Sequence, residues 1–185
     1  MTRRRWCVMV AMALAGAGLV WPVSGQQPQA ANPILVLDTA KGAIEIELLR
    51  GDAPKSVEYI VALVEKNFYR GLRFHRAERA LVQVGDAASR DVSKKAWWGR
   101  SVHTPTVGVA EISRKLIHVR GMVGLAHSGN PAFAHSQFYI MKAADMSLNG
   151  KYTLFGRVRS GMPVVDTLQV GDILKQATIK AAAPK

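Results

Sequence analysis

Cysteine is nearly absent from this 185-residue chain, which has a single one, Cys7. Cys7 lies in an N-terminal segment that looks like a removable leader, so we expect the mature protein to contain no cysteine at all. Disulfide bonds and thiol nucleophiles are thereby excluded, although an exported protein would be free to form disulfides. The mature core must then be held together by packing alone.

Sequence signals of metal, phosphate and nucleophile sites are also missing. No Gly-x-Ser-x-Gly motif occurs, so a hydrolase nucleophile has no support. Two glycines between Gly124 and Gly129 are spaced like a phosphate loop, but Asn130-Pro131 follows where Lys-Ser/Thr is needed. No two histidines stand four apart on a helix as zinc ligands would; they are His75, His103, His118, His127 and His135. We predict no metal and no cofactor.

Acidic residues are scarce, with 13 Asp and Glu against 25 Lys and Arg, for a net charge of +12. Without the three arginines of the leader, 22 basic residues remain, still well in excess. Such a charge is one signature of nucleic-acid binding. The basic residues are scattered, however, and no basic strand with interleaved aromatics occurs. We therefore predict no nucleic-acid partner and expect this surface to face anionic envelope components.

The N-terminus has the features of a secretory signal peptide, which we place at residues 1–25. Arg3–Arg5 form a basic start, Cys7–Val20 is uncharged and apolar, and small residues follow Pro22. The alternative is an uncleaved membrane anchor, but the apolar run is short for ~30 Å of hydrocarbon. We expect a periplasmic or secreted protein without stable membrane insertion after cleavage. The basic start leaves general and twin-arginine export both open.

The remaining chain divides into a linker at 26–33, one domain at 34–180 and a tail at 181–185. A helix is predicted from Asp52–Pro54 to Gly71, and a second one from Gly161. Ala87–Thr106 reads as a loop whose Trp97-Trp98 pair covers a core edge. Alternating or short apolar runs predict strands at Ile34–Leu37, Ala43–Leu48, Phe74–Arg76, Leu81–Val84, Val107–Ile112, Arg120–Ala126, Phe138–Met141, Thr153–Val158 and Ile173–Ile179. Strands that bracket a helix without a βαβ rhythm favour an antiparallel sheet or barrel closed by helices.

The stretch Leu72–Asp86 mixes apolar strand formers with large hydrogen-bond donors. On a continuous strand Phe74 and Arg76 would point to one face and His75 to the other. With Gln83 on the next strand, this pattern predicts a charged donor set on an apolar floor. Taken alone, however, the stretch favours a solvated arginine at a strand edge over such a donor set.

Several motifs together resemble one known family. They are Phe74-His75-Arg76, Gln83–Asp86, Arg120–Pro131, His135–Met141 and Leu148–Gly156. In this order and at this spacing they are similar to those of the cyclophilin family of peptidyl-prolyl cis–trans isomerases, over roughly Ile34 to Ile179. The resemblance implies a mainly β fold, a closed eight-stranded antiparallel barrel capped by two α-helices.

Carried over position by position, the resemblance implies that Arg76 is the catalytic residue. It implies that the peptide and its proline ring are bound by His75, Leu81, Gln83, Ala126, His127, Gln137, Tyr139, Leu148 and Tyr152. The partners would be proline-containing polypeptides of the envelope or secreted fraction, and we expect a monomer. The alternative is a proline-peptide binding module or holdase on the same fold with little turnover.

The chain departs from the family pattern around the proline pocket. The segment between His75 and Gln83 is one residue shorter, and Ala80 or Leu81 stands where a phenylalanine is usual. Tyr139 replaces a phenylalanine, which adds a hydroxyl that needs a partner when buried. Ser147 stands where some relatives carry tryptophan. We expect a less aromatic floor, weaker catalysis and weak inhibition by cyclosporin-type ligands.

Overall fold

The computed structural model describes residues 32–100 and 104–180. The predicted signal peptide, most of the linker, His103 and the tail lie outside these residues, so the division into leader, linker, domain and tail stays a prediction. None of the helices described is both long enough and apolar enough to cross a membrane.

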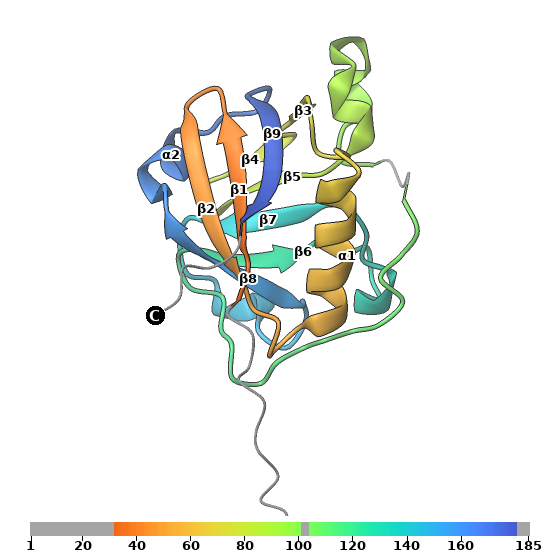
Figure 1. Cartoon of the computed structure of the whole chain (residues 1–185), viewed down its shortest axis with the longest axis vertical. Helices are drawn as coiled ribbons and strands as arrows, with labels where there is room; N and C mark the ends of the chain where they lie inside the picture. The colour runs from red at the N-terminus through yellow and green to blue at the C-terminus, as the bar shows by residue number, and fades with distance from the viewer. Residues whose placement is uncertain (1–31, 101–103, 181–185) are drawn as a thin grey trace, which may run out of the picture. The chain divides into compact units, whose positions relative to one another are not determined.

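Within the described residues, one curled antiparallel sheet of nine strands forms the body of the domain (Figure 1). Its spatial order is β3-β9-β1-β2-β8-β6-β7-β5-β4. The strands are β1 (Ile34–Thr39), β2 (Gly42–Leu48), β3 (Leu72–Arg73), β4 (Arg76–Ala77), β5 (Leu81–Val84), β6 (Met122–Leu125), β7 (Phe138–Met141), β8 (Leu154–Ser160) and β9 (Ile173–Lys180).

The two edge strands of the sheet, β3 and β4, are neighbours in the chain and are separated only by Phe74 and His75. Phe74 N–H donates to the carbonyl of Asp172 at 3.0 Å, whereas His75 N–H donates to that of Gln83 at 3.1 Å. The chain thus leaves one edge and joins the other without a ladder between β3 and β4. The prediction of a closed eight-stranded barrel is wrong in both respects, because this two-residue link leaves the sheet open. It also interrupts the predicted strand Phe74–Arg76, so Phe74 enters the core while Arg76 does not share its face.

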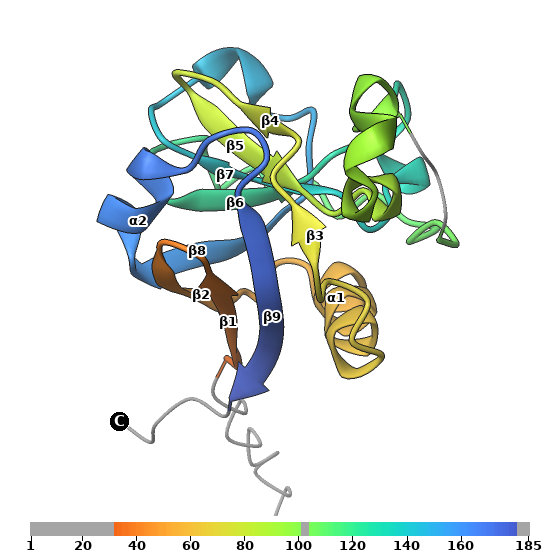
Figure 2. The same cartoon turned by 90° about the horizontal axis from the view of Figure 1, so that it is seen from above.

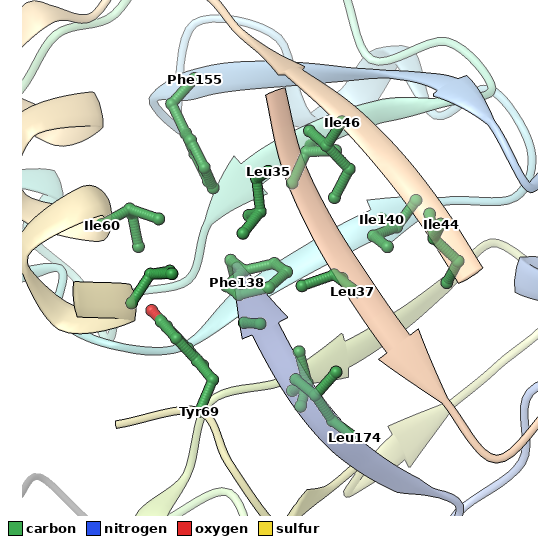
Figure 3. Close-up of a cluster of buried hydrophobic side chains, with 14 of the residues drawn as sticks. Leu35, Leu37, Ile44, Ile46, Ile60, Tyr69, Phe138, Ile140, Phe155 and Leu174 are labelled. Carbon is green, nitrogen blue, oxygen red and sulfur yellow. The ribbon is translucent and has the colours of Figure 1, made fainter. Parts of the chain in front are cut away.

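The main core fills the inside of the curled sheet (Figure 3). Strand alternation supplies it: Leu35 and Leu37 of β1 and Ile44 and Ile46 of β2 are fully buried, and Leu37 pairs with Ile44 across the ladder. Glu45 and Glu47, which alternate with the buried residues of β2, form ion pairs on the outer face. The predicted hairpin is therefore confirmed.

Helix α1 (Pro54–Glu65) packs on this core through Val57, Ile60 and Val64, as its spacing predicts. It ends earlier than the predicted Gly71, because Asn67 adopts a left-handed conformation with φ 55°. Phe68 N–H then donates to the carbonyl of Leu63, and Asn67 N–H to that of Val64, which is the Schellman pattern of helix termination.

The second helix, α2 (Met162–Thr167), begins after Gly161 as predicted and lies on the other side of the sheet from α1 (Figure 2). The predicted strand Val107–Ile112 is wrong. Gly108 turns with φ 81°, and the N–H groups of Val107 and Gly108 donate to the carbonyls of Ala134 and Ala132 in a loop, not to a strand.

The predicted loop Ala87–Thr106 contains two short 3₁₀ helices, η1 (Ala87–Arg90) and η2 (Val92–Trp97). Asp86 and Asp91 accept hydrogen bonds at their starts, a capping role typical of aspartate. Trp97 is 63% exposed and covers no core edge. Trp98 is partly buried and donates its indole N–H to the carbonyl of Asp91.

Candidate active site

A second, smaller apolar cluster underlies one face of the sheet. Its buried members are Leu49, Leu81, Met122, Tyr139, Met141 and Leu154, and Ala126, Leu148 and Tyr152 pack against it. Strands β5, β6, β7 and β8 supply most of these residues. Because the cluster reaches the surface through its partly buried members, it forms an apolar base for a pocket.

That pocket, called here the Arg76 pocket, has a volume of about 250 Å³. It is lined by Arg76, Glu78, Ala80, Leu81, Gln83, Ala126, His127, Tyr139, Asp145, Leu148 and Tyr152. Eight of the ten site residues predicted from sequence are in this set. The structure therefore gathers residues from positions 76 to 152 around one hollow with a cationic group at its side.

Arg76 and Gln83 lie opposite each other on the β4–β5 ladder, so their side chains project from the same face. Arg76 Nη1 lies 3.4 Å from Gln83 Oε1. Gln83 is buried, and its amide nitrogen donates to Gln137 Oε1 at 2.9 Å. Arg76 and Gln83 thus meet in the pocket, with Gln137 hydrogen-bonded behind Gln83.

Glu78 contacts the outer side of the same guanidinium. Arg76 Nε donates to Glu78 Oε1 at 2.6 Å, and Nη2 donates to Oε2 at 2.9 Å. The hydrogen bond from Arg76 lowers the pKa of the Glu78 carboxyl below its usual 4.5. Glu78 is therefore ionised at neutral pH and forms a bidentate ion pair in the wall of the pocket.

Tyr139 stands at the base of the pocket, and its hydroxyl has a partner that the sequence did not reveal. The hydroxyl lies 2.8 Å from His118 Nε2, and His118 Nδ1 lies 3.0 Å from Asn149 Oδ1. Burial, with Tyr152 as a smaller cause, raises the pKa of Tyr139 far above its usual 10. Tyr139 therefore stays protonated and presents a ring, not a charge, to the pocket.

Two further rings, those of Tyr152 and His127, also line the pocket. Tyr152 meets Tyr139 edge-on, with ring centroids 5.7 Å apart, and the His127 ring lies 4.5 Å from that of Tyr152. His127 Nε2 lies 2.9 Å from the carbonyl oxygen of Lys151 and is therefore the protonated ring nitrogen in the neutral form. The wall is fixed in place, with Leu148 partly buried beside it.

Two predicted site residues, His75 and Gln137, lie outside the lining of the Arg76 pocket. His75 follows the buried Phe74 and is itself largely buried, packed close to Gly99. Burial, opposed by the nearby Asp86 carboxylate, lowers the pKa of His75 from 6.5 to about 4. His75 is thus a neutral supporting side chain, and Gln137 acts on the pocket through Gln83.

Sequence reasoning missed four residues of this site: Glu78, Asp145, His118 and Asn149. Glu78 had a usable signal, since it stands two positions after Arg76 and such residues share a face of a strand. Asn149 stands inside the Leu148–Gly156 motif but was not singled out, and His118 and Asp145 lie outside the motifs that carry the resemblance. In the described part of the chain, no group of three His, Cys, Asp or Glu side chains is arranged to hold a metal ion.

The curled antiparallel sheet and its pocket, with an arginine beside an apolar base, define a mainly β protein with a candidate ligand pocket on one face. The family model "Cyclophilin type peptidyl-prolyl cis-trans isomerase/CLD" matches residues 34–183. The chain therefore belongs to the family of cyclophilin-type peptidyl-prolyl cis–trans isomerases.

Individual relatives agree with this assignment. A probable peptidyl-prolyl cis-trans isomerase of Brucella suis is 36% identical over 178 residues, covering 91% of this chain and 89% of that protein. Peptidyl-prolyl cis-trans isomerase-like 3 of Gallus gallus is 36% identical over 137 residues, covering 73% and 81%. In fold, the chain is similar to a Cryptosporidium parvum cyclophilin-type isomerase, with a TM-score of 0.69 at 21% identity, covering 83% of this chain and 99% of that one.

Proposed function

We propose that the protein accelerates rotation about X-Pro peptide bonds in folding envelope or secreted polypeptides, with Arg76 stabilising the twisted amide. The position of Arg76 carries the proposal: it lines the same pocket as Tyr139 and Leu148, with Nη1 3.4 Å from Gln83 Oε1. A Cryptosporidium parvum cyclophilin similar in fold was crystallised in the presence of the dipeptide Ala-Pro, which supports a proline-containing ligand. The envelope location rests on the predicted signal peptide.

The chemistry follows from the amide bond. Rotation has a barrier of ~18–20 kcal/mol, because the nitrogen lone pair is delocalised into the carbonyl. Twisting localises that pair on nitrogen, which becomes a better hydrogen-bond acceptor. A guanidinium beside it is attracted more strongly in the twisted state than in either planar state, and this difference lowers the barrier.

Arginine alone does not supply a large acceleration. A charge-assisted hydrogen bond contributes about 1.5–3 kcal/mol, which corresponds to roughly ten- to 150-fold in rate. The remainder comes from the Arg76 pocket, where Tyr139, Leu148 and Tyr152 hold the pyrrolidine ring out of water. Gln83 and the Ala126-His127 segment hold the peptide backbone. No proton is transferred in this scheme.

A protease-coupled assay on a short X-Pro peptide tests the proposal, with Arg76→Ala as the decisive variant. We expect Arg76→Ala to lose roughly ten- to 150-fold in kcat/KM. Arg120→Ala is the matched control: the Arg120 side chain is 48% exposed, as is that of Arg76, and it pairs with Asp166 outside the pocket. Equal turnover by the wild type and Arg76→Ala would exclude the arginine mechanism.

The second candidate function is a proline-peptide binding module with little turnover. The observation in its favour is the pocket lining at Ala80 and Leu81, which offers less ring surface than a phenylalanine. This function predicts that an X-Pro peptide shifts the NMR signals of pocket residues while cis–trans exchange stays at its uncatalysed rate. Arg76→Ala would then spare much of the binding.

A further inference from the structure

Glu78 makes a contact in the Arg76 pocket that the proposed mechanism has not used. Its carboxylate accepts two hydrogen bonds from one edge of the Arg76 guanidinium, at 2.6 and 2.9 Å. The side chains of Arg76 and Glu78 are 48% and 50% exposed. Because water screens an ion pair of this exposure, the pair adds little to the stability of the fold. Its importance lies in the orientation that it gives the guanidinium.

The contact decides which donors Arg76 has left. A guanidinium carries five N–H donors in a fixed planar fork. Glu78 takes one from Nε and one from Nη2, and Gln83 takes one from Nη1. One N–H on each of Nη1 and Nη2 therefore remains for a ligand.

Glu78 is itself held by the backbone of the β4–β5 turn. Its N–H donates to the carbonyl of Leu81 at 2.8 Å, which extends the ladder beyond Ala77. The carbonyl of Ala80 accepts from the N–H groups of Lys142 and Ala143, at 2.7 and 3.2 Å. The turn is thus fixed at both ends, which fixes the backbone from which the Glu78 carboxylate reaches Arg76, and the ion pair restricts an arginine side chain that otherwise samples many rotamers.

We propose that Glu78 is a positioning residue for the isomerase reaction, which holds the Arg76 guanidinium so that its remaining donors face the prolyl amide. This inference rests on the proposed role of Arg76. It gives the shortened turn between His75 and Gln83 a function, since the turn carries Glu78 at a position that shares a face with Arg76. Loss of the Glu78 carboxylate should slow the bond rotation and leave peptide binding unchanged, because the proline ring is held by Tyr139 and Leu148.

The test compares Glu78→Ala and Glu78→Gln with the wild type in kcat and KM on one X-Pro peptide. We expect kcat to fall about two- to fivefold, the change that corresponds to ~0.4–1 kcal/mol at 1.36 kcal/mol per decade, with KM changed less than about twofold. Glu78→Gln removes the charge and one of the two acceptors, so its kcat should lie between those of Glu78→Ala and the wild type.

Asp166→Asn is the matched control, because it breaks a bidentate pair with Arg120 of similar exposure, at 2.8 and 2.6 Å, away from the pocket. We expect it to leave kcat and KM unchanged. A spectroscopic readout adds a direct test: exchange of the Arg76 Nε–H with water, followed by NMR, should be faster in Glu78→Ala and unchanged in Asp166→Asn.

A double-mutant cycle separates positioning from a general structural effect. In an Arg76→Lys background, a lysine cannot make the two-pronged contact, so adding Glu78→Ala should change the residual kcat little. An active wild type that Arg76→Ala impairs, together with Glu78 variants of unchanged kcat, overturns this inference and leaves the proposed function standing. A wild type without turnover, or one that Arg76→Ala does not impair, overturns the proposed function itself.

Discussion

The hydroxyl of Tyr139 donates a hydrogen bond to Nε2 of His118 at 2.8 Å. The direction follows from Asn149: its Oδ1 accepts both the backbone N–H of His118, at 2.8 Å, and the ring Nδ1, at 3.0 Å. An oxygen that accepts from an amide N–H also accepts from Nδ1–H, which leaves Nε2 as an acceptor. The buried Tyr139 hydroxyl, which a phenylalanine would lack, thereby has a hydrogen-bond partner beneath the pocket.

Tyr139→Phe should make the protein less stable while it keeps turnover. The change leaves the buried His118 Nε2 without its donor, which costs about 1–3 kcal/mol, and the pocket keeps its ring. Urea unfolding of the variant gives the difference in stability, and the peptide assay gives turnover. Tyr139→Phe combined with His118→Leu should be less destabilised than the sum of the single variants, because no unpaired polar atom remains. An additive loss would contradict the coupling.

Stability should fall as the pH falls from about 6.5 towards 4. Burial lowers the pKa of His75 to about 4 and also lowers that of His118, so folding disfavours the protonated form of both rings. The unfolded chain takes up protons below pH 6.5 and is favoured progressively as the pH falls towards the folded values. The His75 shift alone corresponds to roughly 3 kcal/mol, lost in full only near pH 4.

Urea unfolding between pH 4 and 7.5 measures this slope. His75→Gln removes the group whose pKa is lowered most among the histidines and should flatten the slope, whatever its effect on stability at pH 7.5. A slope identical in wild type and His75→Gln would show that His75 does not titrate as its burial requires.

Glu111→Ala should destabilise the protein by about 1 kcal/mol without loss of turnover. The Glu111 carboxylate accepts from the N–H groups of Lys55 and Ser56, at 2.9 and 2.8 Å, and so caps α1 from a distant segment. Its charge also suits the positive helix N-terminus. Thermal or urea unfolding provides the measurement. Glu58→Ala, an exposed change on the same helix, is the control and should cost less than about 0.5 kcal/mol.

The hydrogen bonds from α1 to Glu111 explain why the segment Val107–Ile112 was wrongly predicted as a strand. The residues of Val107–Ile112 look like a strand, but their partners are a helix terminus and the loop at Ala132–Ala134, far away in sequence. The end of α1 was missed for the opposite reason, since it depends on the backbone of Asn67 alone, a residue that tolerates the left-handed region. Strands such as β2 were predicted correctly because burial of one face makes apolar and polar residues alternate strictly in the sequence.

Most pocket residues that stand in recognisable motifs were predicted, whereas a residue that meets the pocket only through another side chain was missed. Arg76, Gln83, Tyr139 and Leu148 stand in recognisable motifs, and they meet in space. His118 has no motif, because it serves only as the acceptor for one hydroxyl. Closure of the sheet was mispredicted because the outcome depends on which carbonyls Phe74 and His75 meet, and no residue type encodes that choice.

Cyclosporin-type ligands should inhibit this protein weakly. Resemblance to the family leads one to expect an aromatic side chain at two positions of the site, and this chain has none at either. Ala80 lines the Arg76 pocket without an aromatic ring, and Ser147 is exposed, with its hydroxyl bonded to Asp145 at 2.6 Å. An aromatic contact adds about 0.5–1.5 kcal/mol beyond the area it buries, or up to roughly tenfold in affinity.

Ser147→Trp should therefore tighten binding in isothermal titration by about three- to tenfold, and Ala80→Phe by a similar factor. Phe133→Ala, a ring removed outside the pocket lining, is the control and should leave the affinity unchanged. Tight binding by the wild type, or no gain in either aromatic variant, would mean that these two positions do not control the ligand.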